Sequence, residues 1–410
     1  MAKDDADLGL GRLQALAELE LPAYLSDLEA LVGIDSGSYT KAGVDRVGRW
    51  MADALRDLGA VVRVEPNREL GDTVVGALHG RGRGRILVIG HLDTVFDPGT
   101  AASRPFRVAG GRAYGPGVCD MKAGLLSGIH ALRVLRASAS SQLPWLPCAT
   151  LTFVANPDEE IGSPASTPII RALAAEHDAA LVLESARANG DIVSARKGNL
   201  SAALILHGRS AHAGVEPEKG RSAILEAAHK IVALHGLNGR WPGVTCNVGV
   251  VRGGTRANVV AEEAVLEVDL RSPTRADLES AEAAVRQIAA AATVPDVTCD
   301  LTIRGRHWPM ERLPVTEALA GAAARIAEGL GFPLQDAATG GASDANTTAG
   351  EGVPSLDGLG PVGGLDHSPD EYIEVNSIVP RMALLAALLR AIGSGMIPGL
   401  RLRDAAGGPR

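Results

Sequence analysis

Apolar and polar positions along the chain follow two different patterns. Over residues 1–198, segments with apolar positions at helical spacing are separated by short, continuous apolar runs. The helical segments are residues 13–33, 41–59 and 121–137. The apolar runs are residues 85–90, 149–155 and 179–183, and each is typical of a strand covered on both faces. This order predicts an α/β fold with a mixed, mostly parallel sheet flanked by helices.

The pattern changes at residue 199. Residues 264–271 alternate strictly, with Leu266, Val268 and Leu270 on one face and charged residues on the other. The remaining expected elements are strands at 201–208, 244–251 and 297–305 and helices at 222–235 and 276–293. The order strand-helix-strand-strand-helix-strand predicts a two-layer α+β domain. A strand face this charged indicates a sheet that helices cover on one side only.

The helix-rich pattern returns after residue 306, with helices expected near 316–330 and 378–392. The small domain is therefore predicted to be an insertion in the larger one. The expected divisions are residues 1–198 and 306–400 for the two parts of the large domain, 199–305 for the insertion and 401–410 for a loose tail.

The composition narrows the classes of function. The chain has 410 residues, a net charge of -8 and no basic excess, which argues against partners such as nucleic acid or an anionic membrane. We expect no apolar run long enough to cross a bilayer, and the acidic start does not resemble a signal peptide. Four scattered cysteines without a C-x-x-C pair indicate free thiols, so we expect a cytoplasmic protein.

Polar residues follow the predicted buried strands where these end. His91 and Asp93 follow the first strand, the run 156–160 (NPDEE) follows the second and Glu184 the third. Because ligand sites in open α/β sheets lie at the carboxyl ends of the strands, these side chains are expected to converge. Asp120 and His367 lie in Gly-rich loops and can join them.

Each of these residues also has an ordinary structural interpretation. Asp120 can be a helix N-cap, the Glu159-Glu160 pair can be solvated surface, and a lone histidine in a glycine loop is seldom a ligand. Taken together, these residues favour a metal site over the ordinary interpretations, because several carboxylates at one edge of a sheet repel one another unless a cation lies between them. Two histidines with three carboxylates suit zinc, and His91-x-Asp93 suits an imidazole held by a carboxylate.

With these motifs the sequence resembles the co-catalytic dizinc metallopeptidase family of glutamate carboxypeptidases, aminoacylases and desuccinylases. The likeness to glutamate carboxypeptidases, which remove C-terminal glutamate from folates, is strengthened by RPFRVAGGRAYGPG at 104–117. The resemblance implies a zinc-exopeptidase-like fold in which the inserted domain forms a homodimer. The motifs that carry it are GHLDTV at 90–95, GVCDMK at 117–122, DEE at 158–160, Glu184 and His367.

The resemblance also implies a role for each residue. Asp120 would bridge two zinc ions, with His91 and Glu184 completing one metal site. Glu160 and His367 would complete the other. Cobalt or manganese can replace zinc in such sites. Two ions that share a water lower its pKa to about 7.

The remaining roles concern catalysis and the substrate. Glu159 would act as the general base, Asp93 would hold His91, and His212 would hydrogen-bond the developing oxyanion across the dimer. The implied substrate contacts are Asn258, Arg271, the carboxylate clamp Arg306 and the Gly-rich loop at Gly341. His212 can instead be an ordinary loop histidine, Arg271 a strand surface charge and the glycine loop a plain turn.

The sequence thus predicts a zinc-dependent carboxypeptidase for small peptide, folate-type or N-acyl amino acid substrates, with glutamate as the C-terminal residue. An aminoacylase or N-acyl-amino-acid deacetylase of the same family is the nearest alternative. A catalytically silent homologue that only binds ligand is the alternative from another class. The presence of Glu159 with the full ligand set argues against that last possibility.

Overall fold

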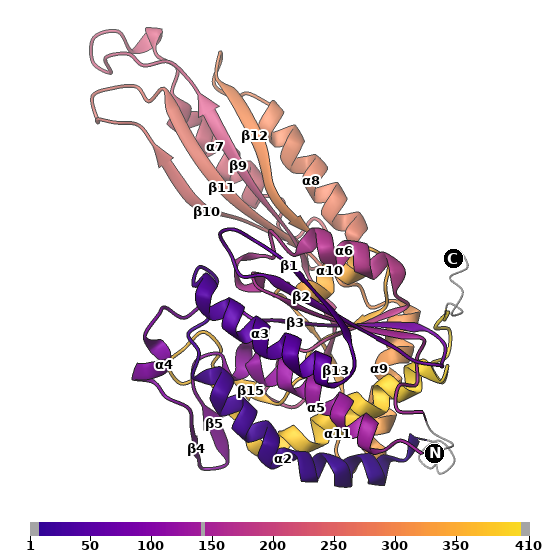
Figure 1. Ribbon diagram of the computed structural model, residues 1–410. Coiled ribbons are helices and arrows are strands. Elements are labelled where there is room, and N and C mark those ends of the chain that lie inside the picture. Colours follow the sequence, from indigo (N-terminus) through magenta and orange to yellow (C-terminus); the bar gives the residue numbers. More distant parts are fainter. Residues whose placement is uncertain (1–7, 141–143, 403–410) are drawn as a thin grey trace. The chain divides into compact units, whose positions relative to one another are not determined.

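The chain forms two compact units, shown in Figure 1 as a computed structural model that describes residues 8–140 and 144–402. Unit 1 comprises the residues up to Ser194, Arg312–Ala338 and the residues from Ser343 onwards. Unit 2 comprises Ala195–Glu311 and Thr339–Ala342, so it interrupts unit 1 in the sequence. Of the tail expected at 401–410, all but residues 401 and 402 lie outside the described residues.

The main sheet of unit 1 has six strands in the order β1-β2-β6-β3-β7-β14. Strands β6, β3, β7 and β14 run parallel, whereas β2 pairs antiparallel with β1 and β6. The predicted α/β class with a mixed, mostly parallel sheet is therefore confirmed. The strands are β1 (Val61–Glu65), β2 (Thr73–His79), β3 (Arg85–His91), β6 (Thr150–Asn156), β7 (Ala179–Val182) and β14 (Ser355–Leu356).

Strands β1 and β2 were not expected from the apolar pattern. β1 is mostly exposed, so its VVRVE sequence lacks the continuous apolar run of a covered strand. β2 is interrupted by Gly76, where a Cβ would lie 2.9 Å from Leu55 Cδ1 on the helix packed over the strand. The helix that carries Leu55 can pack this closely only because residue 76 is glycine. A glycine within a strand interrupts the run of apolar side chains by which the strand would be recognised.

Helices flank the sheet of unit 1. Helices α2, α5 and α11 pack on one another, as do α6 and α10 (Figure 1). Helix α5 is buried over most of its length, with Arg133 and Arg136 outside the buried set. The helices are α2 (Leu10–Val32), α3 (Lys41–Asp57), α4 (Thr100–Ser103), α5 (Ala123–Ala137), α6 (Thr167–Glu176), α9 (Pro314–Gly329), α10 (Asp344–Gly350) and α11 (Val375–Gly393).

Two smaller sheets complete this part of the chain. One has the order β15-β16-β5-β4, and the other pairs β13 with β8, the strands in which the chain passes between the units. Two short irregular helical segments, η1 and η2, carry predicted site residues. These elements are β4 (Arg107–Ala109), β5 (Arg112–Tyr114), η1 (Val118–Lys122), η2 (Glu159–Ile161), β8 (Ile192–Arg196), β13 (Asp336–Thr339), β15 (Gly363–Gly364) and β16 (Tyr372–Glu374).

Helix α11 corrects one expectation. It has 19 residues and enough apolar character to cross a membrane by length and composition, although we expected no such run. The helix instead lies in the core of unit 1, where its segment Met382–Ile392 is buried. Arg390 on this helix donates hydrogen bonds to the Leu8 carbonyl and to Ser138 Oγ, 2.6 Å each. Burial within the unit, rather than a lipid environment, accounts for its apolar sequence.

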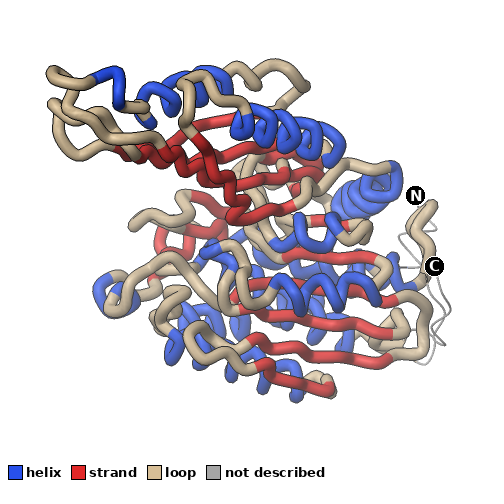
Figure 2. Tube along the Cα trace, turned by 90° about the horizontal axis from the view of Figure 1, so that it is seen from above, coloured by secondary structure: helices blue, strands red, loops and turns tan. Residues whose placement is uncertain are grey.

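Unit 2 is a four-stranded antiparallel sheet in the order β10-β11-β9-β12. Figure 2 shows helices α7 and α8 on the same side of this sheet. The inward face of β11 carries Leu266, Val268 and Leu270, as its alternation predicts. The elements are β9 (Gly198–His207), η3 (Pro217–Lys219), α7 (Ala223–His235), β10 (Thr245–Gly253), β11 (Glu263–Ser272), α8 (Arg275–Ala290) and β12 (Thr298–His307).

Unit 2 also includes residues 339–342, which we had assigned to the larger domain. Hydrogen bonds hold this segment within unit 2. Lys197 N donates to the Thr339 carbonyl at 3.1 Å, and Arg271 donates to the Gly340 carbonyl at 2.9 Å. This assignment depends on contacts between residues that are far apart in the sequence, which the apolar pattern does not reveal.

Candidate metal centre

Three neighbouring strands of unit 1 place the predicted ligands at one edge of the sheet. β6 and β7 flank β3 in parallel, and His91 at the end of β3 is level with Asn156 at the end of β6. The chain then enters η2 with Glu159 and Glu160, while Glu184 follows β7. The parallel register therefore brings the three strand ends together, as expected for a site in an open α/β sheet.

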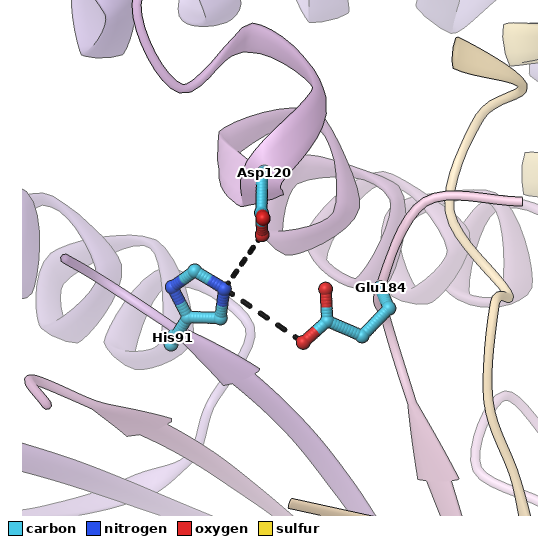
Figure 3. A group of neighbouring side chains, drawn as sticks. All are labelled: His91, Asp120 and Glu184. Atoms are coloured by element: carbon cyan, nitrogen blue, oxygen red, sulfur yellow. Dashed lines mark hydrogen bonds and ion pairs between the residues drawn. The ribbon is translucent and has the colours of Figure 1, made fainter. Parts of the chain in front are cut away.

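The first group of ligand atoms comprises His91, Asp120 and Glu184 (Figure 3). His91 Nε2 lies 2.9 Å from Asp120 Oδ1 and 3.7 Å from Glu184 Oε1. The potential ligand atoms all lie within 4.8 Å of one another. One imidazole nitrogen thus faces two carboxylates that come from different parts of unit 1.

The second group comprises Asp120, Glu160 and His367. His367 Nε2 lies 3.1 Å from both Asp120 Oδ2 and Glu160 Oε2. Asp120 therefore belongs to both groups and uses a different carboxylate oxygen in each. This is the arrangement needed for a carboxylate that bridges two cations.

Burial and close contacts strongly shift the pKa values of the side chains in both ligand groups. Burial raises the pKa of Glu184 well above its usual value and that of Glu160 to about 7. Burial lowers the pKa of His91, but hydrogen bonds to Asp120 and Asp93 outweigh it, and the net pKa is well above 6.5. The hydrogen bond to Asp120 raises the pKa of His367 to about 9. Without a bound cation, the negative charge of these buried carboxylates has to be neutralised by protons bound to the carboxyl and imidazole groups.

Divalent cations fit this donor set. Each group offers one imidazole nitrogen and two carboxylates, and both ligand types bind zinc. Glu160 Oε1 is buried and has no hydrogen-bond partner among the described residues. An unpartnered buried carboxylate oxygen is costly, and a bound cation would satisfy it.

Asp93 connects the ligands to the predicted base. Its Oδ1 lies 3.3 Å from His91 Nδ1 and accepts a hydrogen bond from Glu159 N at 3.1 Å. Its Oδ2 accepts from Glu160 N at 3.2 Å and from Ser38 Oγ at 2.7 Å. Asp93 therefore contacts both His91 and the backbone of η2, and its carbonyl oxygen also lies 3.0 Å from His91 Nδ1. Its role in orienting His91 stays a prediction.

Glu159 directly precedes the ligand Glu160 in η2 but is in neither set of ligand atoms. Burial raises the pKa of Glu159 well above its usual value, and Asp344 and Asp120 raise it further. Asp344 is the first residue of α10, directly after the N-cap Ser343, and accepts a hydrogen bond from Ser163 Oγ at 2.7 Å. A carboxyl group that is not a ligand and has a raised pKa is suited to accept and return a proton.

Two contributors to this site were not identified from the sequence. They are Asp344, which follows the glycine-rich loop of Gly341, and Glu371. The buried Glu371 accepts hydrogen bonds from the backbone of the Asp120 segment. Glu371 lies four residues after His367, which places it near a predicted ligand in the sequence. This spacing does not indicate that Glu371 bonds the backbone around Asp120.

The remaining predicted residues lie in unit 2. His212 and Asn258 are exposed on adjacent loops, where Ala213 N donates to the Asn258 carbonyl at 3.0 Å. His212 Nδ1 accepts from Gly214 N at 3.1 Å, which leaves Nε2 for another partner. The loop positions of His212 and Asn258 are compatible with a role in recognition.

The predicted arginines of unit 2 are paired within that unit. Arg271 contacts Asp269 Oδ1 at 2.9 Å, and Gly341 is exposed on the loop that follows β13. Arg306 forms an ion pair with Glu282, and its guanidinium carbon lies 5.0 Å from the centroid of the Trp308 ring. A substrate carboxylate at Arg306 would therefore compete with Glu282.

Comparisons with known proteins agree with these motifs. The profile of peptidase family M20/M25/M40 matches residues 87–391. The chain is 29% identical to carboxypeptidase G2 of Pseudomonas sp. (strain RS-16) over 381 residues, which cover 92% of this chain and 91% of that protein. It is 30% identical to acetylornithine deacetylase of Proteus mirabilis (strain HI4320) over 272 residues, which cover 62% of this chain and 68% of that one.

A solved structure extends the similarity to the whole fold. Aminopeptidase PepT from Bacillus cereus ATCC 10987 matches with a TM-score of 0.73 and 25% identity, over 91% of this chain and 98% of that one. The family expected from the sequence motifs is thereby confirmed. This chain belongs to peptidase family M20/M25/M40.

Proposed function

We propose that the protein is a dizinc carboxypeptidase that hydrolyses the amide bond to a C-terminal glutamate in a small peptide, folate-type or N-acylated substrate. The observation that carries the proposal is the pair of ligand groups that share Asp120, with Glu159 beside them. The similarity to carboxypeptidase G2 along almost the whole chain supports the carboxypeptidase assignment.

The ligand groups define where the metal would be held. His91 and Glu184 would hold one ion and Glu160 and His367 the other, with Asp120 shared. Bound zinc would supply Lewis acidity toward the substrate carbonyl and a water of lowered pKa. Manganese or cobalt is compatible with the same oxygen-rich donor set.

Glu159 would move the proton during hydrolysis. Its carboxylate would accept a proton from the attacking water and deliver it to the amine as the C–N bond breaks. The products are the acyl carboxylate and the free amino acid, so atoms and charge balance. Asp93 supports this step because it fixes the backbone N–H groups of Glu159 and Glu160.

Substrate recognition by unit 2 belongs to the same proposal. We propose that Arg306 binds the α-carboxylate and that Asn258, Arg271 and Gly341 make further contacts. We also propose that unit 2 forms a homodimer in which His212 stabilises the oxyanion in the partner copy, and that the protein acts in the cytoplasm. These assignments rest on the family resemblance and on the exposed loop positions of His212 and Asn258.

A hollow of about 400 Å³ beside Glu160 supports a bulky acyl group. The hollow is formed entirely by unit 1, and its apolar lining includes Tyr39, Val95 and Phe96. Tyr39 is 79% exposed, so its ring is available to contact a ligand. An aromatic or extended acyl group would cover this surface, whereas an acetyl group would not.

The similarity to acetylornithine deacetylase supports a second candidate, an N-acyl-amino-acid deacetylase. The zinc-loaded protein should be assayed with N-benzoylglutamate, pteroylglutamate and N-acetylornithine. We expect hydrolysis of the first two, loss of activity with a chelator and recovery with Zn²⁺. Preference for N-acetylornithine would establish the deacetylase instead. If two ions bind but no substrate is hydrolysed, the chain is the silent homologue.

A further inference from the structure

Asp120 requires an unusual support because its segment is not a regular helix. Within η1, Asp120 has φ -115° and ψ 96°, and Met121 has φ -132° and ψ 39°. Backbone N–H groups in such a segment lack the partners that a helix provides, and buried ones must find acceptors elsewhere. The position of this backbone matters because Asp120 takes part in both ligand groups.

Glu371 supplies these acceptors. Its Oε1 accepts from Cys119 N at 2.7 Å and from Asp120 N at 2.9 Å, and its Oε2 accepts from Gly117 N at 3.0 Å. The Glu371 side chain is buried, so water does not compete for these bonds. Both oxygens of one carboxylate are thus directed at the segment that presents Asp120.

The same residue lies on the loop that presents His367. Residues 365–371 form a turned segment in which Ser368 N donates to the Leu365 carbonyl at 3.1 Å. Strand β16 begins directly after Glu371, and its first residue, Tyr372, pairs with Tyr114 of β5. The loop is therefore anchored just beyond Glu371, and movement of Glu371 would displace His367 and the Asp120 segment together.

We infer that Glu371 is a positioning residue that fixes the spacing between Asp120 and His367 and so determines metal affinity, mainly in the second ligand group. This inference rests on the proposed function only in taking Asp120 and His367 as metal ligands. Two of the three ligands in the second group depend on Glu371, whereas only Asp120 does so in the first. Loss of Glu371 should therefore affect the two groups unequally.

The test is calorimetric titration of the metal-free protein with Zn²⁺. E371Q keeps the size of the side chain but places an NH₂ group against backbone N–H donors. We expect one of the two ions to bind about 10- to 100-fold more weakly, the usual effect of losing a group that supports a ligand. E374Q is the matched control, because Glu374 lies on the adjoining strand and pairs with Arg112 away from the ligands. It should bind both ions as the wild type does.

Combining E371Q with a substitution in each ligand group shows which group binds the weakened ion. With H367A the second group is broken, so adding E371Q should change the affinity of the remaining ion only slightly. With E184Q the first group is broken, and adding E371Q should produce the full weakening. Equal effects in both backgrounds, or unchanged Zn²⁺ affinity in folded E371Q, would overturn the inference.

A second measurement is independent of metal. In the metal-free wild type, the N–H groups of Gly117, Cys119 and Asp120 should exchange slowly with deuterium, and E371Q should speed exchange in this segment without changing it in unit 2. Unchanged exchange contradicts the inference.

If E371Q does not fold, E371D replaces it in both experiments, because it keeps the charge but is one methylene shorter. Normal metal binding without substrate hydrolysis would refute the proposed function and leave this inference intact.

Discussion

The predicted site residues of unit 1 and unit 2 have contrasting surroundings. In unit 1 the ligands contact one another, and most are buried or half-buried. His91 and Asp93 are each 1% exposed, whereas the His367 side chain is 53% exposed. In unit 2, His212 and Asn258 are exposed and Arg306 is paired with Glu282. Buried, mutually bonded groups hold a fixed geometry, as metal ions require, whereas exposed loops can adapt to a substrate. We therefore expect substitutions in unit 1 to affect turnover and metal content, and substitution of the proposed carboxylate clamp Arg306 in unit 2 to affect substrate binding.

The largest effect is expected for Glu159→Ala. Loss of the general base should lower kcat by at least about 10²-fold, while the metal content stays at the wild-type value because Glu159 is in neither ligand group. Steady-state kinetics with elemental analysis would measure both. Glu176→Ala, at an exposed position at the end of α6, is the control. Near-normal kcat in Glu159→Ala would show that another group moves the proton.

The next largest effect concerns the shared ligand. Asp120→Asn should remove tight binding of both ions, whereas Glu184→Gln should remove only one, because Asp120 alone belongs to both groups. Metal content after dialysis against a weak chelator distinguishes the two outcomes. Asp72→Asn, which breaks the ion pair with Lys41, should leave the content unchanged. Equal losses for Asp120→Asn and Glu184→Gln would contradict a bridging role.

A smaller effect, on substrate binding, is expected in unit 2. Arg306→Ala should raise KM for N-benzoylglutamate by about 10- to 100-fold, equivalent to about 1.5–3 kcal/mol for a charged hydrogen bond, with little change in kcat. Arg275→Ala is a matched control because the Arg275 guanidinium also stacks on Trp308, 4.1 Å from the ring centroid. An equal rise in KM in both variants would indicate that packing on Trp308, rather than the Arg306 charge, is responsible.

The smallest effect is on stability. Burial lowers the pKa of His177 below 6.5, while its ring hydrogen-bonds Leu173 and Thr152 in unit 1. The unfolded chain therefore binds the proton at His177 more readily than the folded chain does. The contribution of neutral His177 to stability is complete above pH 6.5 and is lost as the pH drops below it. The slope for one group is at most about 1.4 kcal/mol per pH unit.

Urea denaturation at pH 7.5 and pH 5.5 checks this prediction. His177→Gln should remove the His177 contribution, so the change in unfolding free energy from pH 7.5 to pH 5.5 should be more favourable to folding in the variant than in the wild type. His207→Gln, at an exposed position of β9 in unit 2, should leave the difference unchanged. The wild-type difference alone does not test this direction, because the carboxyl groups with raised pKa values, such as Glu160, favour the folded state at the lower pH. A His177→Gln protein whose change in unfolding free energy between the two pH values equals that of the wild type would contradict it.

The elements with strong periodicity could be predicted from the sequence, because burial on both faces requires a continuous apolar run and burial on one face requires alternation. The expected strand at 85–90 is observed as β3, Arg85–His91, and the expected helix at 276–293 as α8, Arg275–Ala290. Exposed β1 has no such signal, and α11 shows that core burial and membrane insertion can favour the same composition.

The candidate ligands could be predicted because they follow strand ends and belong to contiguous motifs. Contacts between distant segments could not. The partner of Arg306, Glu282, lies 24 residues away on another element, and the partners of Glu371 lie more than 250 residues away. Charge and motif spacing predict which residues carry chemistry, but tertiary packing determines which neighbours restrain them.

The hydrogen bond from Arg390 to the Leu8 carbonyl joins the two ends of the described chain and has a consequence for synthesis on the ribosome. Helix α11 completes the packing around α2 and α5, so the hydrophobic core of unit 1 stays open until residues near 390 have left the exit tunnel. The residues that form the core of unit 2 have all emerged well before that point. Nascent unit 1 thus exposes apolar surface until α11 has emerged, and slow elongation through the codons of α11 would prolong that exposure.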